Sequence, residues 1–196
     1  MPRKLVVLTF VSLDGVMQAP GGKGEDPSGN FDLEGWTVPY FDEVVGDEMG
    51  KQMGQPFDLL LGRKTYDVFA SYWPHHESPI NRAQKYVVSS EAIDTDWEGT
   101  IPIKSDVVVE IKQLKQQDGP MLQVHGSSSL IQTLFANDLV DELWLKIFPV
   151  TLGKGKRLFG EGTIPAAFKL TESNVSPSGV IIASYKRDGE VRLGSF

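Results

Sequence analysis

Residues 124–159, VHGSSSLIQTLFANDLVDELWLKIFPVTLGKGKRLF, bring together the elements that decide the fold. The run MLQVH at 121–125 is short and apolar, which predicts a buried strand, and ELWLKIF at 142–148 predicts a second one. Between the two runs, residues 127–137 repeat apolar side chains at helical spacing, namely Leu130, Ile131, Leu134 and Phe135. A strand, a helix and a further strand in this order are typical of an α/β domain with a largely parallel sheet.

The same alternation extends over the rest of the chain. Further apolar runs predict strands at residues 4–11, 57–61, 85–89 and 179–185. Helical spacing predicts helices at residues 39–53, 63–69 and 106–117. The first of these helices places Phe41, Val44, Val45, Met49 and Met53 on one face. The last two strands follow without a helix between them and are joined through SNVSPSG at 173–179, so we expect an antiparallel hairpin at the sheet edge within one domain spanning residues 1–196.

Two stretches interrupt this alternation. Residues 18–37, QAPGGKGEDPSGNFDLEGWT, contain seven Gly and Pro residues and predict a long loop. A loop of that length inside a compact domain is usually functional or disordered. Residues 72–83, YWPHHESPINRA, predict a second loop that is interrupted by prolines.

The composition excludes several classes of protein. The 196 residues carry 19 Lys and Arg against 26 Asp and Glu, a formal net charge of −7, which disfavours general nucleic-acid and anionic-membrane binding. The chain has no cysteine, which excludes disulfides, thiolate metal sites and cysteine nucleophiles, and which fits a reducing cytoplasm. No apolar run approaches the ~20 residues needed to cross a bilayer. We therefore expect a cytoplasmic protein with no nucleic-acid and no membrane partner.

Small polar and basic residues follow three of the predicted strands: GRKT at 62–65, SS at 89–90 and GSSS at 126–129. Ligands of open α/β sheets bind at the carboxyl ends of the strands. There these residues would offer a phosphate group backbone N–H groups, hydroxyl donors and cations. The three junctions together indicate a ligand with several phosphates, although helix caps and glycine turns explain each junction when it is taken alone.

Several standard motifs do not occur. The sequence has no G-x-x-x-x-G-K-[ST] and no G-x-G-x-x-G after the first strand, which disfavours P-loop NTPases and Rossmann dehydrogenases. The segment HGSSS at 125–129 lacks the G-x-S-x-G pattern of serine hydrolases. His75 and His76 are adjacent and lack the spacing of zinc ligands, so we expect no metal site.

Four stretches resemble the dihydrofolate reductase fold family, and they are most similar to the branch that holds the reductase domain of the bifunctional riboflavin-biosynthesis enzyme and its stand-alone relatives. They are SLDGVMQ at 12–18, DLLLGRKTYDVF at 58–69, KYVVSS at 85–90, and the stretch at 124–159 with its L-x-D-E-L and P-V-x-L-G-x-G-x-x-L-F patterns. The resemblance implies a single three-layer α/β domain of dihydrofolate reductase-like type with a mostly parallel sheet and a C-terminal antiparallel hairpin. It also implies NADPH as the cofactor, a small-molecule substrate, and a homodimer as a further expectation.

Carried over by position, the resemblance implies a role for each junction. Gly62, Arg63, Lys64 and Thr65 would meet the phosphates of the cofactor, and Ser89 and Ser90 would flank its 2′-phosphate. Gly126, Ser127, Ser128 and Ser129 would cradle the pyrophosphate. The turn that contains Ser12, Gly15 and Met17 would border the nicotinamide. A cation and hydroxyls beside a 2′-phosphate would select NADPH over NADH.

The sequence departs from the family pattern in the pyrophosphate turn and at the catalytic acid. Relatives usually place a second glycine in that turn, whereas three serines follow Gly126 here. Dihydrofolate reductases place an acid early in the first helix, after a Trp and a Pro. Here that position holds Phe41, and Asp42 follows one residue later, about 100° further round a helix. Asp42 is therefore a candidate catalytic acid, or else a residue of the first helical turn that the helix dipole favours.

Two further residues stand at predicted strand ends. Asp14 lies in a Leu-Asp-Gly turn and is a second catalytic candidate, since it either faces the ligand or only holds the turn. His125 precedes Gly126 and either approaches the substrate or packs in the core.

The sequence thus predicts an NADPH-dependent reductase that transfers a hydride to a small heterocyclic substrate, most like 5-amino-6-(5-phosphoribosylamino)uracil reductase of riboflavin biosynthesis. Two alternatives stay open. One is a non-catalytic NADPH- or nucleotide-binding protein of the same fold, and the other is a dihydrofolate reductase-like enzyme with a different substrate.

Overall fold

The computed structural model describes residues 2–160 and 163–195. Residues 1, 161–162 and 196, which the predicted domain includes, lie outside the described part of the chain. The strands are β1 (Leu5–Ser12), β2 (Phe57–Gly62), β3 (Lys85–Val88), β4 (Thr100–Ile103), β5 (Met121–Val124), β6 (Glu142–Phe148), β7 (Phe168–Val175) and β8 (Ile181–Arg187). The α-helices are α1 (Glu43–Met53), α2 (Arg63–Tyr72), α3 (Val107–Gln116) and α4 (Ser128–Ala136). Single turns of 3₁₀-helix occur at η1 (Val38–Tyr40), η2 (Trp73–His75) and η3 (Pro79–Asn81).

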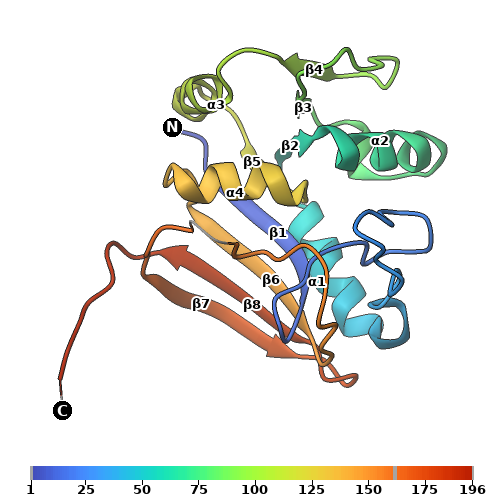
Figure 1. Ribbon diagram of the computed structural model, residues 1–196. Coiled ribbons are helices and arrows are strands. Elements are labelled where there is room, and N and C mark those ends of the chain that lie inside the picture. The colour runs from blue at the N-terminus through green and yellow to red at the C-terminus, as the bar shows by residue number, and fades with distance from the viewer. Residues whose placement is uncertain (1, 161–162, 196) are drawn as a thin grey trace.

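The strands of the described chain form one sheet in the order β4-β3-β2-β5-β1-β6-β8-β7. All pairs from β4 to β6 are parallel, and β8 pairs antiparallel with both β6 and β7. The predicted α/β fold with a mostly parallel sheet and a C-terminal antiparallel hairpin is therefore confirmed (Figure 1). Because the strands β3, β2, β5, β1 and β6 are all parallel, their carboxyl ends lie along one edge of the sheet.

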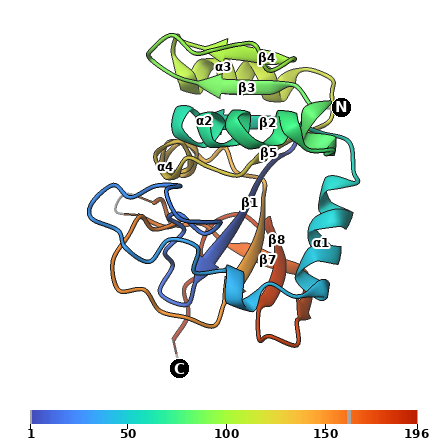
Figure 2. The same cartoon turned by 90° about the vertical axis from the view of Figure 1, so that its right-hand side faces the viewer.

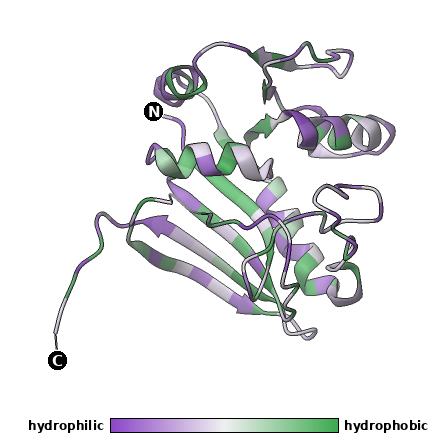
Figure 3. Ribbon diagram, viewed as in Figure 1, coloured by the Kyte–Doolittle hydropathy of each residue, from purple (hydrophilic) through white to green (hydrophobic). Residues whose placement is uncertain are grey.

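Helices cover both faces of the sheet, and successive side chains of a strand point to opposite faces. The largest core cluster packs Leu60 of β2 and Val124 of β5 against α3 and α4, while Leu59 and Leu61 pack with Tyr66 of α2 on the other face. Figure 2 shows α4 and α1 on opposite sides of β1. Figure 3 shows that β1 is hydrophobic along most of its length, as expected for a strand buried on both faces, whereas polar bands recur along the β7–β8 hairpin.

The first helix begins later than its apolar spacing predicts. The expected helix at 39–53 starts only at Glu43, because Asp42 caps it with extended backbone, and the residues before it form η1. Phe41, expected on the helical face, precedes the helix and is 46% exposed. Its ring packs edge-on against Phe10 of β1, with 6.4 Å between the ring centroids.

Two strands had no signal in the sequence. β4 has the sequence TIPI and lies at one edge of the sheet, where a proline is tolerated because one side of the strand needs no partner. β7 has the sequence FKLTESNV and lies at the other edge, where all of its residues except Phe168 are exposed. Among the described residues, no helix is both long and apolar enough to span a membrane.

Candidate functional site

Two of the three predicted junctions meet in space. β2 and β5 are neighbours in the sheet, and the N–H of Gly62 donates to the carbonyl of Gly126 at 3.1 Å. A Cβ on Gly62 would lie 2.9 Å from the Cβ of Ser127, and a Cβ on Gly126 would lie 3.4 Å from the Cβ of Thr65 and closer still to its hydroxyl. Both positions therefore require glycine, because the two chain segments cross too closely for a side chain.

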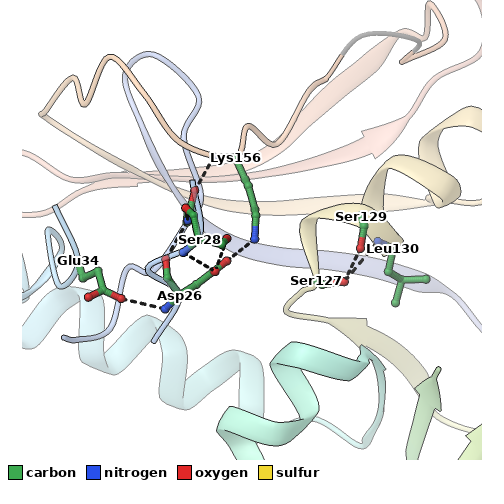
Figure 4. A network of polar contacts seen from close by, with 8 residues as sticks. Asp26, Ser28, Glu34, Ser127, Ser129, Leu130 and Lys156 are labelled. Carbon is green, nitrogen blue, oxygen red and sulfur yellow. Dashed lines mark hydrogen bonds and ion pairs between the residues drawn. The ribbon is translucent and has the colours of Figure 1, made fainter. Parts of the chain in front are cut away.

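The turn after β5 leads directly into α4. Ser127 is the N-cap of α4, where its hydroxyl accepts from the N–H of Leu130 at 3.4 Å and pairs with the hydroxyl of Ser129 at 2.9 Å (Figure 4). The peptide bond between Gly126 and Ser127 is cis. Ser128 is the first helical residue and is half-buried, while Ser129 is exposed. The turn thus presents hydroxyls and the N–H groups of a helix start, which are donors suited to an anion.

Arg63 opens α2 beside this turn. Its Nε donates to both carboxylate oxygens of Asp67 at 2.9 Å, and its Nη1 donates to the carbonyl of Ala92 at 2.8 Å. A more distant carboxylate, Glu91, lies 3.7 Å from Nη1. The guanidinium therefore bridges α2 and the loop that follows β3. The neighbouring Lys64 is exposed and makes no ion pair with any described residue.

The loop after β3 contains the two predicted serines. Ser89 is buried, and its hydroxyl accepts from the N–H of Glu91 at 3.1 Å and donates to the carbonyl of Glu91 at 3.0 Å. Ser90 is exposed. Because Arg63 contacts Ala92 in the same loop, the structure brings Arg63 and the serine pair to one place at the sheet edge.

The turn after β1 is the fourth predicted part of the site, and hydrogen bonds between its own residues close it. Ser12 N–H donates to the carbonyl of Val16, and Val16 N–H donates to the hydroxyl of Ser12, both at 2.9 Å. Gly15 has φ +81°, a conformation that favours glycine. Met17 is buried and donates its N–H to the carbonyl of Lys156 at 2.8 Å. This hydrogen bond attaches the turn to the 150–157 segment, which follows β6.

Asp14 braces that turn. Its carboxylate accepts from the hydroxyl of Ser12 at 2.5 Å and from the N–H groups of Leu152 at 3.1 Å and Gly153 at 2.8 Å. The Ser12 hydroxyl and then these amides lower the pKa of Asp14 to about 2, against the effect of burial. A carboxylate with such a pKa is ionised near neutral pH and cannot donate a proton. These contacts correspond to the turn-holding interpretation of Asp14 rather than to an acid.

Asp42, at the start of α1, also accepts hydrogen bonds from backbone amides. Its carboxylate accepts from the N–H of Val45 at 3.0 Å, which is the N-cap contact of α1, and from the N–H of Ser178 at 3.0 Å. Burial raises the pKa of Asp42, but the hydrogen bonds from Val45, Ser178 and Ser176 outweigh it and lower the pKa to about 2. The side chain therefore joins α1 to the turn between β7 and β8. These are the contacts of a helix cap, and they give Asp42 no proton to donate near neutral pH.

The 18–37 loop packs against the β1 turn. All of its residues are described, and they run without a helix or strand. Lys156 forms an ion pair with Asp26, whose N–H donates to Glu34 at 2.9 Å (Figure 4). Gln18 donates its side-chain amide to the carbonyls of Asp26 and Ser28 at 2.8 and 2.9 Å. The loop is therefore fastened to the site through its own polar groups.

A buried polar network lies on the α1 side of the sheet, and sequence reasoning missed most of it. Lys146 of β6 is fully buried and donates to the side-chain oxygen of Gln52 in α1. The side-chain amide of Gln52 lies 3.4 Å from the carboxylate of Glu48, and Gln123 of β5 donates to the backbone carbonyl of Gln52 at 3.1 Å. Gln123 in turn lies 3.3 Å from Nε2 of His125, the last member. A single polar residue inside an apolar run, such as Lys146 in ELWLKIF, is the signal that could have found the network.

Burial shifts the two basic groups of this network. It lowers the pKa of Lys146 to about 7, although the nearby carboxylate of Glu48 raises it. Burial, and after it the positive charge of Lys146, lower the pKa of His125 to about 3. His125 is therefore a neutral imidazole at the carboxyl end of β5.

Comparisons with known proteins agree with this architecture. The Bacillus subtilis protein YyaP, an uncharacterized protein, is 28% identical over 196 residues, which cover 95% of this chain and 96% of that protein. A solved structure from Shewanella sp. PV-4, provisionally assigned to riboflavin biosynthesis, has a TM-score of 0.68 at 24% identity and covers 96% of this chain and 99% of its own. Dihydrofolate reductase from Enterococcus faecalis, solved with NADP(H), has a TM-score of 0.61 at 15% identity over 94% of this chain and 96% of its own. These likenesses show the dihydrofolate reductase-like fold.

The family is shown by a model that covers nearly the whole chain. The family model described as the RibD C-terminal domain matches residues 3–182, which include every junction of the candidate site. Members of this family and of the dihydrofolate reductase family are reductases. The chain therefore belongs to the RibD C-terminal domain family.

Proposed function

We propose that the protein is an NADPH-dependent reductase that transfers a hydride to a small heterocyclic substrate, most like 5-amino-6-(5-phosphoribosylamino)uracil. The observation that carries the proposal is the close crossing of the β2 and β5 junctions, where Gly62 and Gly126 leave no room for side chains. A pyrophosphate group can approach the backbone closely at two glycines, and the serine hydroxyls and the N–H groups at the start of α4 can donate hydrogen bonds to it.

The proposed cofactor contacts follow the order of the strands. Gly62, Lys64, Thr65 and the segment 126–129 hold the phosphates, and the β1 turn with Ser12, Gly15 and Met17 borders the nicotinamide. Arg63, Ser89 and Ser90 receive the 2′-phosphate, since they share one place at the sheet edge. When bound there, NADPH supplies the hydride. The ion pairs of Arg63 with Asp67 and Glu91 keep the guanidinium near the loop after β3 until a more highly charged anion competes for it.

Neither carboxylate candidate donates the proton that must accompany the hydride. Asp14 and Asp42 are ionised near neutral pH and bound by amides. We propose that both hold the walls of the site in place, Asp14 beside the nicotinamide and Asp42 at the start of α1.

The ionised state of Asp14 and Asp42 favours a second function. A site that keeps the cofactor edge but whose two candidate acids, Asp14 and Asp42, are ionised could bind NADPH or another nucleotide without turnover. The three serines that follow Gly126, where relatives have a second glycine, fit a changed ligand at this turn.

Thermal unfolding in the presence of NADPH tests the proposal. A ligand at 100 times its Kd stabilises the folded state by about 2.7 kcal/mol, which is readily measured. We expect stabilisation by NADPH, less by NADH, and oxidation of NADPH with at least one substrate from a panel of pyrimidines, pterins and carbonyl compounds. No stabilisation by millimolar NADPH would contradict the reductase proposal, and binding without oxidation across the panel would favour the non-catalytic function.

A further inference from the structure

His125 stands where a ligand at the sheet edge has to pass. β5 lies between β2 and β1 in the sheet, so its carboxyl end separates the Gly62 junction from the β1 turn. Any molecule that spans these two places crosses the end of β5, and His125 directly follows the last residue of that strand. Its ring lies 5.7 Å from the ring of Phe69 in α2, on the face that α1 and α2 cover.

The hydrogen bonds behind His125 decide which ring nitrogen carries the proton. The side-chain nitrogen of Gln123 donates to the backbone carbonyl of Gln52 at 3.1 Å, which turns the Gln123 oxygen toward the imidazole. Nε2 of His125 lies 3.3 Å from that oxygen and must donate to it. Nδ1 is then the unprotonated nitrogen and a hydrogen-bond acceptor.

Nδ1 is also free to meet a ligand. Among the described residues it has no hydrogen-bond partner, and within the same residues no buried side-chain nitrogen or oxygen lacks one. An unpartnered Nδ1 is therefore reached by solvent, which agrees with the half-buried state of the residue.

Burial, and after it the charge of Lys146, keep the imidazole of His125 uncharged by lowering its pKa. The charged groups around the network are Lys146 of β6 and, from α1, Glu48 with its ion-pair partner Lys51 at 3.5 Å, while α2 contributes the apolar ring of Phe69. A cationic imidazole would bind phosphate or carboxylate, whereas a neutral one with a free lone pair binds an N–H or O–H group.

We infer that His125 contacts the substrate and accepts, through Nδ1, a hydrogen bond from a neutral N–H or O–H group, such as the amino or ring N–H of an aminopyrimidine. The inference rests on the proposed function for the word substrate and goes beyond it by naming the recognised group. Gln123 is a positioning residue that fixes the tautomer, and the burial of the ring, with Lys146 behind it, disfavours the charged form.

Side-chain NMR of the ¹⁵N-histidine-labelled full chain tests this at pH 7. We expect the Nε2–H tautomer for His125, assigned by the signal lost in His125→Phe. With 5,6-diaminouracil as the probe we expect the Nδ1 resonance to move as it accepts a hydrogen bond. With 1,3-dimethyluracil, which has the carbonyls but no N–H, we expect no movement. An Nδ1–H tautomer, or the same response to both probes, including none to either, would overturn the inference.

Binding of the same probes gives a second readout. Loss of one neutral hydrogen bond weakens affinity by about three- to tenfold, so His125→Phe should lose that much for 5,6-diaminouracil and nothing for 1,3-dimethyluracil. His75→Phe, in the exposed loop after α2, is the matched control and should change neither. Gln123→Met should let both tautomers appear in the NMR spectrum, which a merely structural glutamine would not do.

The two proposals fail separately. If NADPH binds and is oxidised while the Nδ1 resonance does not move with either probe, the inference about His125 is wrong and the reductase proposal stands. If the Nδ1 resonance moves with 5,6-diaminouracil but NADPH neither binds nor stabilises the protein, the reductase proposal is wrong. The inference that His125 accepts a hydrogen bond from the ligand then stands.

Discussion

Gly62 at the end of β2 and Ser127 at the cap of α4 lie so close that a Cβ on Gly62 would stand 2.9 Å from the Cβ of Ser127. The methyl group of Gly62→Ala has to displace the turn after β5. Forced overpacking of this kind costs about 1–3 kcal/mol. We expect a loss of that size in the free energy of unfolding measured with urea, together with weaker NADPH binding.

Two variants control this prediction. A Cβ at Gly50, inside α1, would meet nothing within 4 Å, so Gly50→Ala should stabilise the protein by about 0.5–1 kcal/mol. Adding Ser127→Gly to Gly62→Ala removes the opposing Cβ and should recover part of the loss, since glycine is nearly as good a helix cap as serine. A double variant that is no more stable than Gly62→Ala would show that the contact with Ser127 is not the cause.

Arg63→Ala tests the selection of the cofactor. If the guanidinium leaves Asp67 for the 2′-phosphate, the variant loses a charge-assisted interaction worth about 1.5–3 kcal/mol with NADPH, which is a factor of about ten to one hundred, and little with NADH. Titration calorimetry with both dinucleotides measures the difference. Arg82→Ala, at an exposed arginine of the 72–83 loop, is the matched control. Equal losses for the two dinucleotides would remove the assignment.

Asp42 can be tested by exchanging its cap for another. Asp42→Ala removes the acceptor for Val45 and should lower the thermal midpoint, whereas Asp42→Ser keeps an N-cap hydroxyl and should recover much of it. If Asp42 only caps α1, the folded Asp42→Ser protein keeps its turnover rate. A stable Asp42→Ser protein with no turnover would instead restore Asp42 as a catalytic acid.

Asp14 makes the free energy of unfolding depend on pH in the acidic range. Its pKa in the folded state, about 2, lies below the ordinary value of 3.8, so the unfolded chain binds the proton more readily as the pH falls. The contribution of Asp14 is therefore complete above about pH 5 and is lost as the pH falls toward 2. The stability difference between the wild type and Asp14→Asn, from urea unfolding, should be largest near pH 6 and should shrink below about pH 4. A difference that does not change with pH would contradict this role.

Lys146 gives a dependence of the same sign at alkaline pH. Its pKa in the folded state, about 7, lies below the ordinary value of 10.5, so the folded state loses the proton first as the pH rises. Stability then increases with pH between about 7 and 10, because burying the neutral amine costs less than burying the cation. Lys146→Met should flatten this rise in urea unfolding measured at pH 7 and pH 9.5. The variant should also raise the pKa of His125 in the NMR titration, since it removes a neighbouring positive charge.

The sequence predicted most of the fold because the buried strands repeat apolar residues without interruption. The strand, helix and strand of residues 121–148 were visible for this reason. β7 could not be found from such a pattern, because an edge strand exposed on both faces has no apolar side to repeat. The start of α1 was misplaced because Phe41 continues the helical spacing while its side chain packs on Phe10 before the helix begins.

The site was predictable to the extent that it follows the strand ends. Parallel strands end at one edge, so the segments 62–65, 89–90 and 126–129 could be grouped without knowing their contacts. The contacts that side chains near the site make with distant parts of the chain could not be predicted. Gln52 meets Gln123 across 71 positions and Lys146 across 94, and neither pairing leaves a mark in local sequence. Asp14 and Asp42 likewise accept hydrogen bonds from the distant residues 152–153 and 178, in addition to their local partners, so the sequence left their roles open.

The attachment of the β1 turn to the 150–157 segment has a consequence for synthesis of the chain. β1 is made before the other strands of the sheet, yet both of its neighbours, β5 and β6, are made in the second half of residues 1–196. The turn also waits for Leu152, Gly153 and Lys156 before its amides and carboxylate are paired. We expect a nascent chain stopped before residue 121 to expose an unpaired β1 and to depend on chaperones. We expect protection from proteolysis by NADPH to begin only after residue 157 has emerged.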